Sequence, residues 1–190
     1  AKAMAEDGNP YLLNDYVASR QLVVPTTLSV VEASLAISRS ETASVFNDLP
    51  TMRNRRLLVA GTGVAGLALT LWAKFSRAHV TCLGRRESRL ELAEQLGADV
   101  AVNTTEPEWK EQVLSQGGPV DGVIEAIGNP SLARELETLV QPNGFLVAYG
   151  APENGETFSE KWTVADVKEQ TAYRWVADLL AREWVKAEWF

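Results

Sequence analysis

The 190-residue sequence contains one cysteine, Cys82, and one histidine, His79. A single cysteine cannot form a disulfide within the chain and is typical of a reducing compartment, so we expect a cytoplasmic protein. One Cys and one His are too few for an ordinary zinc site built within this chain. No apolar run is long enough to span a membrane, and no signal peptide is visible. The net charge of −7 and the pI near 4.9 argue against general nucleic-acid binding.

A strand followed by a glycine-rich turn is the most informative pattern in the sequence. Residues 55–60 predict a short strand, the glycines of G-x-G-x-x-G follow, and residues 67–74 favour a helix. We expect Gly61 to form the tight turn, Gly63 to let a diphosphate approach the backbone, and Gly66 to let the helix pack close to the strand. The diphosphate would bind the free N–H groups at the positive end of the helix dipole. The pattern predicts dinucleotide binding.

The end of the second predicted strand, residues 78–83, indicates which dinucleotide is bound. A fold that binds NAD usually has Asp or Glu about 20 residues after the glycine loop, where it binds the ribose 2′-hydroxyl. Gly84 occupies that position here, and Arg85 and Arg86 follow, with Arg89 one helical turn later. Guanidinium groups bind phosphate in bidentate fashion. We therefore predict NADP in preference to NAD; the alternative, a solvated basic face, is disfavoured because cations destabilise a helix N-terminus.

The rest of the chain alternates between strands and helices. Further strands are predicted at residues 98–102, 120–128 and 145–150, and further helices at 88–96, from 106 onward and at 132–140, with a turn at 142–144. Strands separated by single helices predict an α/β fold, a doubly wound parallel sheet of the Rossmann type with its ligand at the carboxyl ends of the strands. Two flanking helices are predicted at residues 27–46 and 164–184, each with a partial apolar face.

These segments carry a family resemblance. Residues 57–66, 84–99, 120–130 and 144–152 resemble the cofactor-binding half of a medium-chain dehydrogenase/reductase, of the zinc alcohol and polyol dehydrogenase superfamily. The resemblance implies that residues 27–190 form the dinucleotide-binding domain and that residues 1–26 are a remnant of the connection to a catalytic domain absent from the sequence. That domain would carry Cys and His ligands of zinc.

A third zinc ligand found in many members would fall at Ile37, which cannot bind metal, while Glu41 is out of register. The resemblance therefore implies no metal ligand and no catalytic residue in this chain. It places the diphosphate, the adenosine ribose with its phosphate, the nicotinamide ribose and the carboxamide on four successive segments. Their residues are Gly61, Thr62, Gly63, Val64, Ala65 and Gly66; Gly84, Arg85, Arg86 and Arg89; Ala126, Ile127 and Gly128; and Tyr149, Gly150 and Ala151.

By the same resemblance, the full enzyme is expected to be an NADP-dependent, alcohol dehydrogenase-like oxidoreductase, and this chain alone is expected to be inactive. Its small-molecule alcohol or carbonyl substrate would be bound through the absent domain, and a homodimer is expected through the edge of the sheet. One alternative is a non-catalytic module that senses NAD(P)(H). A methyltransferase is disfavoured, because it needs an acidic residue where Gly84 stands.

Three further side chains require interpretation. His79 stands at the start of the second strand, the end far from the cofactor, so we do not expect it to be catalytic. Tyr149 is expected to fill a gap beside the sheet rather than to touch substrate. Glu125, inside the fourth strand, has two open readings: its carboxylate is satisfied by a neighbour, or it points into the site.

Overall fold

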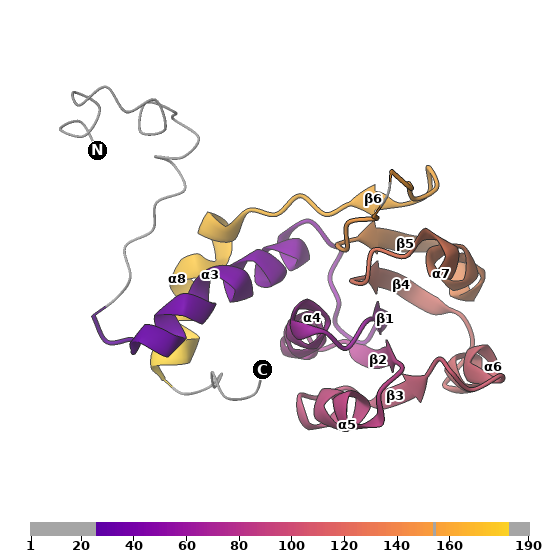
Figure 1. Cartoon of the computed structure of the whole chain (residues 1–190), viewed down its shortest axis with the longest axis horizontal. Coiled ribbons are helices and arrows are strands. Elements are labelled where there is room, and N and C mark those ends of the chain that lie inside the picture. Colours follow the sequence, from indigo (N-terminus) through magenta and orange to yellow (C-terminus); the bar gives the residue numbers. More distant parts are fainter. Residues whose placement is uncertain (1–25, 154, 183–190) are drawn as a thin grey trace.

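A six-stranded sheet forms the centre of the molecule (Figure 1). The computed structural model describes residues 26–153 and 155–182, so the predicted connection at residues 1–26 lies almost wholly outside the described residues. All strand pairs are parallel, and their order is β3-β2-β1-β4-β5-β6, which is typical of the Rossmann fold. The predicted doubly wound sheet is therefore confirmed. The strands are β1 (Arg56–Ala60), β2 (His79–Gly84), β3 (Val100–Asn103), β4 (Val120–Glu125), β5 (Val140–Ala148) and β6 (Thr163–Val164).

Helices cover both faces of the sheet (Figure 1). Short helices α6 and α7 pack on one face, and α3, α4 and α8 gather on the other, with α5 beside β2 and β3. Within the described residues, no helix is both long enough and apolar enough to cross a membrane. The helices are α3 (Val30–Ser44), η1 (Val45–Asn47), α4 (Val64–Phe75), α5 (Glu87–Gln95), α6 (Trp109–Ser115), α7 (Pro130–Leu136), η2 (Glu137–Leu139) and α8 (Glu169–Ala181).

Strand β1 is buried on both of its faces. Leu57 and Val59 pack with Leu69 of α4, whereas Leu58 and Ala60 point to the other side, toward α6 and α7. Successive side chains of a strand alternate between faces, so a strand covered on both sides is apolar throughout. This explains why residues 57–60 form a continuous apolar run rather than an alternating one.

The partial apolar face predicted for α3 and η1 is buried at Ala36 and Val45 but not at Val31, and small polar side chains share the buried face. Val31 is 61% exposed, while Ser40 and Thr42 are buried. The Ser40 hydroxyl donates to the Ala36 carbonyl at 2.5 Å, and the Trp72 indole N–H donates to the Thr42 hydroxyl at 3.0 Å. Because the Ser40 hydroxyl is bonded within the helix and the Thr42 hydroxyl is bonded by Trp72, both can be buried where α3 packs against α4.

Helix α8 packs against α3, but it is shorter than predicted. The predicted helix begins at residue 164, whereas α8 begins at residue 169 and residues 163–164 form β6, a strand that was not predicted. Residue 184, the predicted end, lies outside the described residues. On the apolar face predicted for this helix, Ala172, Val176 and Leu180 are buried against α3 and α4, whereas Trp175 is 41% exposed.

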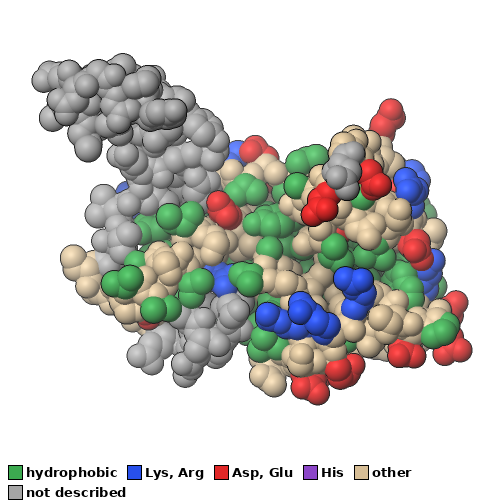
Figure 2. All heavy atoms as spheres, viewed as in Figure 1, with side chains coloured by type: hydrophobic (Ala, Val, Ile, Leu, Met, Phe, Trp, Pro, Cys, Tyr) green, Lys and Arg blue, Asp and Glu red, His purple; other side chains and the backbone are tan. Residues whose placement is uncertain are grey.

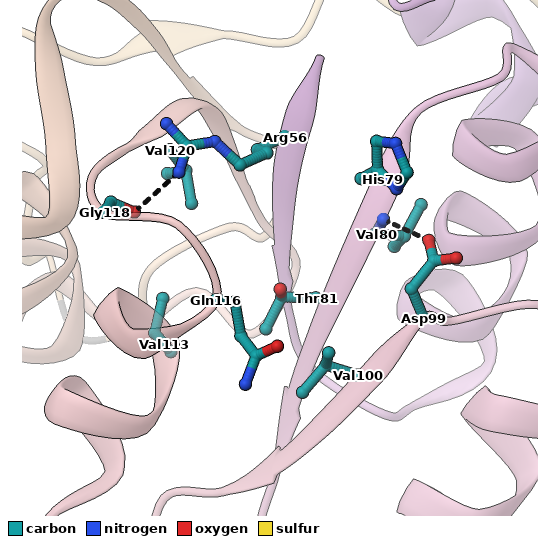
Figure 3. A pocket seen from close by; sticks show the side chains of 10 residues that line it. All are labelled: Arg56, His79, Val80, Thr81, Asp99, Val100, Val113, Gln116, Gly118 and Val120. Carbon is teal, nitrogen blue, oxygen red and sulfur yellow. Dashed lines mark hydrogen bonds between the residues drawn. The ribbon is translucent and has the colours of Figure 1, made fainter. Parts of the chain in front are cut away.

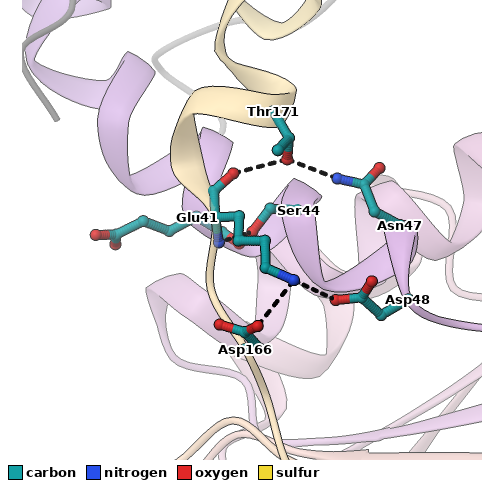
Figure 4. A network of polar contacts seen from close by, with 7 residues as sticks. Glu41, Ser44, Asn47, Asp48, Asp166 and Thr171 are labelled. Carbon is teal, nitrogen blue, oxygen red and sulfur yellow. Dashed lines mark hydrogen bonds and ion pairs between the residues drawn. The ribbon is translucent and has the colours of Figure 1, made fainter. Parts of the chain in front are cut away.

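Polar contacts tie the start of α8 to the end of α3 (Figure 4). The Lys168 backbone N–H donates to the Ser44 hydroxyl at 3.0 Å, and the Asn47 amide donates to the Thr171 hydroxyl at 2.7 Å. The Lys168 ammonium lies 2.8 Å from Asp166 and 3.4 Å from Asp48. Since the C-terminus of α3 meets the N-terminus of α8, the two helices form an antiparallel pair.

The segment between α7 and the core of β5 differs from the prediction. The helix predicted at residues 132–140 ends at Leu136, and η2 follows it. The predicted turn at residues 142–144 lies inside β5, where the pairing with β4 shifts from Val120–Val140 to Gly122–Phe145. The extra residues on β5 form an irregularity that keeps the strand in the sheet, so the Pro-Asn-Gly sequence marks a bulge rather than a turn.

Candidate functional site

A cleft of about 910 Å³ lies at the carboxyl ends of β1, β2 and β4. Its volume is within the range of small-molecule and cofactor sites. Eight predicted site residues line it: Gly61, Thr62, Gly63, Gly84, Arg85, Arg86, Ala126 and Ile127. The other predicted residues do not line it: Val64, Ala65, Gly66, Arg89, Gly128, Tyr149, Gly150 and Ala151. The prediction missed the cleft wall formed by Leu83, Thr104, Trp109, Asn129, Ser131, Leu132 and Glu135.

The glycine loop has the geometry that the sequence predicts. Gly61 adopts the left-handed backbone conformation, with φ of 121°. A Cβ at Gly66 would overlap the Gly61 carbonyl, so only glycine lets α4 approach the strand this closely. A Cβ at Gly63 would meet open space, and Gly63 is the N-cap of α4 without a side-chain capping bond. The first N–H groups of α4 are therefore available to an anion.

Gly84 is needed for a contact that the sequence did not reveal. A Cβ at this position would lie 2.6 Å from the Thr62 Cγ2 and 2.8 Å from its Oγ1. The space that an acidic side chain would enter is therefore filled by the buried Thr62 of the glycine loop. The absence of a side chain at Gly84 makes room for the loop itself as well as for a ligand.

Arg85 and Arg86 stand at the mouth of the cleft, where β2 ends and α5 begins. Both are exposed, and neither forms an ion pair with any carboxylate in residues 26–153 and 155–182. Lys and Arg side chains gather in the middle of the face seen in Figure 2, over the region of β1 and β2. This local positive charge on an acidic protein suits an anionic ligand.

A buried cation also lies close to the glycine loop. Arg39 of α3 is 1% exposed, and its guanidinium donates to the Val64 carbonyl at 3.4 Å. Burial lowers the pKa of Arg39 to about 10, and nearby Tyr149 opposes this shift, so the side chain stays charged at neutral pH. Burial, with the charge of Glu41, raises the pKa of Tyr149, which is half-buried. Arg39 was not predicted to lie near the site, because the buried face of α3 is partly polar and carries no clear periodic pattern.

The metal-ligand position derived from the resemblance points outward. Ile37 is 50% exposed on α3. Across residues 26–153 and 155–182, no three His, Cys, Asp or Glu side chains gather where they could hold a metal ion.

A smaller cavity of about 240 Å³ opens at the opposite, amino edge of the sheet (Figure 3). His79, Asp99 and Arg56 stand around it, and the Val80 N–H donates to the Asp99 carboxylate at 2.7 Å. The structure thus places His79 at the edge away from the larger cleft, as predicted. Cys82 is fully buried in β2, and burial raises the pKa of its thiol to about 11.

The comparisons with known proteins agree with this geometry. A family described as "Zinc-binding dehydrogenase" matches residues 64–176, more than half of the chain. The L-threonine 3-dehydrogenase of Symbiobacterium thermophilum is 38% identical over 84 residues, which are 43% of this chain and 24% of that enzyme. The curated relatives are therefore much longer than the stretch that matches them.

Two solved structures share the fold. A short chain alcohol dehydrogenase from E. coli CFT073, complexed with NADH, has a TM-score of 0.76 and 22% identity over 90% of this chain and 54% of that one. A zinc-binding dehydrogenase from Sinorhizobium meliloti 1021, bound to NADP, has a TM-score of 0.75 and 21% identity over 86% of this chain and 52% of that one. The chain spans about half the length of these solved relatives.

Proposed function

The chain belongs to the zinc-binding dehydrogenase family, and from this premise we propose that residues 27–190 are the NADP(H)-binding domain of an alcohol or polyol dehydrogenase-like oxidoreductase. The observation that carries the proposal is the pair Arg85–Arg86 at the mouth of the cleft, directly after Gly84. In the part of the chain that the structure describes, neither guanidinium group has an ion-pair partner, so both can attract a 2′-phosphate. The last residue of β2 is Gly84 rather than the Asp or Glu that binds a ribose 2′-hydroxyl.

The cleft fits a dinucleotide in shape and charge. The open space at Gly63 and the free N–H groups of α4 would bind the diphosphate, with Thr62 beside it. Ala126 and Ile127 would form the wall on the far side of β1, since β4 and β2 flank that strand. The dinucleotide, when bound, supplies the hydride chemistry; the chain orients it and shields it from water.

The substrate would be a small alcohol or carbonyl compound held by a catalytic domain that is not part of residues 27–190. No pair of a nucleophile and an adjacent base stands among the side chains that line the cleft. Residues 27–190 would therefore hold the cofactor, and the catalytic domain would supply the substrate contacts. NADH and NADP are each bound by one of the solved relatives, so the arginine pair decides our choice of NADP.

Titration with NADPH and with NADH tests the proposal. Trp109 lines the cleft, so binding is expected to quench tryptophan fluorescence and to sensitise emission from the reduced nicotinamide. We expect NADPH to bind at least about tenfold more tightly, or about 1.4 kcal/mol. The double variant Arg85→Ala/Arg86→Ala should lose this preference and keep its NADH affinity.

A matched control removes two other arginines. Arg53 and Arg77 are exposed and precede β1 and β2, at the amino edge of the sheet. The double variant Arg53→Ala/Arg77→Ala changes the net charge equally, so it should retain the preference for NADPH. Equal affinity of the wild-type chain for both nucleotides, or equal loss of preference in the two double variants, would refute the arginine clamp.

A further inference from the structure

Glu125, the last residue of β4, is a carboxylate buried away from solvent, with 0% exposure. Three successive backbone N–H groups converge on it: Ile127 at 2.9 Å, Gly128 at 2.9 and 3.0 Å to the two oxygens, and Asn129 at 3.3 Å. Burial raises the pKa of this carboxyl, and the three donors oppose that shift. The carboxylate is therefore satisfied by the loop that follows it, which resolves the two readings left open by the sequence.

The main chain of Glu125 holds a second loop. Its carbonyl accepts hydrogen bonds from the Tyr149 N–H at 2.8 Å and the Gly150 N–H at 2.9 Å, just beyond the end of β5. The two loops also touch each other, because a Cβ at Gly150 would overlap the backbone of Gly128. One buried residue thus fixes the chain after β4 and the chain after β5 in a single interlocked unit.

This unit forms one side of the cleft. Ala126, Ile127 and Asn129 line it, and Ile127 remains 50% exposed. In the order β2-β1-β4-β5, the arginine pair after β2 and the loops after β4 and β5 lie on opposite sides of the glycine loop. Since a dinucleotide extends across the carboxyl edge of such a sheet, its adenosine half would lie on the arginine side and its nicotinamide half on the Glu125 side.

We propose that Glu125 is a positioning residue for the nicotinamide half of the cofactor: it does not touch the cofactor, but its carboxylate sets the place of the loop that does. This inference rests on the proposed function. A buried anion held by consecutive N–H groups fixes the path of residues 126–129 more firmly than neutral hydrogen bonds would, because bonds to a charged acceptor are stronger. The loop wall is thus set before any ligand arrives.

The test compares two ligands in the 190-residue chain. NADPH contains both halves of the cofactor, and adenosine 2′,5′-bisphosphate contains only the half expected at Arg85 and Arg86. In Glu125→Gln, an amide NH₂ replaces one acceptor and faces the N–H groups of the loop. We expect NADPH to bind about tenfold more weakly while the bisphosphate binds as in the wild-type chain, both measured by isothermal titration calorimetry.

Two further variants make the test specific. Glu125→Asp keeps the charge but shortens the side chain, so it should change the ratio of the NADPH and bisphosphate affinities in the same direction. If Glu125→Gln does not fold, Glu125→Asp still tests the proposal. Asp121→Asn is the matched control, because Asp121 lies near the start of β4, at the end of the strand opposite Glu125. Its carboxylate accepts hydrogen bonds from the Arg56 N–H at 2.8 Å and from the Gln141 amide at 2.7 Å. This control variant should lower stability and leave the ratio unchanged.

The outcomes separate the two proposals. A ratio changed by both Glu125 variants, and not by Asp121→Asn, supports the positioning role. If the wild-type chain binds both ligands and the Glu125 variants weaken both equally or neither, Glu125 is only a structural residue. Should the wild-type chain bind neither ligand, the proposed function fails and the inference falls with it.

Discussion

The contact between Gly84 and Thr62 allows a sharp prediction for the variant Gly84→Ala. The backbone at Gly84 is not in the left-handed region, so alanine can adopt it. The new Cβ would nevertheless lie 2.6 Å from the Thr62 Cγ2, 2.8 Å from its Oγ1 and 3.1 Å from the Leu90 Cδ2. Carbon atoms in contact are normally about 3.5–4.0 Å apart, so the Thr62 side chain must move by most of an ångström.

The magnitude follows from two opposed effects. Overpacking of a tight interior costs about 1–3 kcal/mol. Replacing glycine by alanine restricts the unfolded chain and stabilises by about 0.4–1 kcal/mol. Overpacking dominates, because Thr62 is only 7% exposed and lies in the glycine loop, where it has little freedom to move. We expect Gly84→Ala to destabilise the chain by about 1–2 kcal/mol.

A double-mutant cycle isolates the contact. Thr62→Ala removes both atoms that approach closest to the new Cβ, so in that background Gly84→Ala should be nearly neutral. The free energies of unfolding of the four proteins are measured by urea denaturation, and we expect a coupling of about 1–2 kcal/mol. Additivity of the two substitutions within about 0.5 kcal/mol would show that Thr62 does not limit the space at Gly84.

Two other predictions concern titratable groups. The Cys82 thiol, buried with a pKa near 11, should react with a thiol reagent at pH 8 only after unfolding; labelling of the native chain as fast as of the urea-unfolded chain would contradict its burial. Burial raises the pKa of Asp99, but its hydrogen bonds to the Lys74 ammonium at 2.5 Å and to the Val80 N–H outweigh this effect, so the pKa lies below its ordinary value. A depressed pKa stabilises the fold above the unfolded-state pKa of about 3.9, and this contribution is lost as the pH falls through the folded pKa. The free energy of unfolding of Asp99→Asn, measured in urea, should therefore fall further below that of the wild-type chain at pH 6 than near pH 3. A difference in unfolding free energy that does not depend on pH would contradict this assignment.

Local patterns made the centre of the fold predictable. The strand at residues 56–60 and the glycines at 61, 63 and 66 act over a few residues, so their geometry follows from chain sterics alone. The parallel sheet followed from alternation of strands and helices, since right-handed crossovers leave few topologies. Half of the predicted site residues line the cleft for the same reason: they are the last residues of strands or the first after them.

Long-range contacts account for what was missed. Trp109 and Ser131 line the cleft because α6 and α7 pack against the same face of the sheet, and no local pattern encodes that. Strand β6 has only two residues, too few for any periodicity, and it exists because β5 offers it an edge. The requirement for Gly84 depends on Thr62, which is 22 positions earlier in the sequence and was read only as part of the glycine loop.

The antiparallel pairing of α3 with α8 also suits this domain to insertion into another protein. Because the start of α8 is bonded to the end of α3, the start of α3 and the end of α8 lie at the same end of the pair, as Figure 1 shows. The path into the domain and the path out of it are therefore neighbours in space. A domain whose two ends are adjacent can be inserted into another protein without moving apart the two residues of the host chain that it joins. Such a module could be spliced into a surface loop of an unrelated protein and retain its own core.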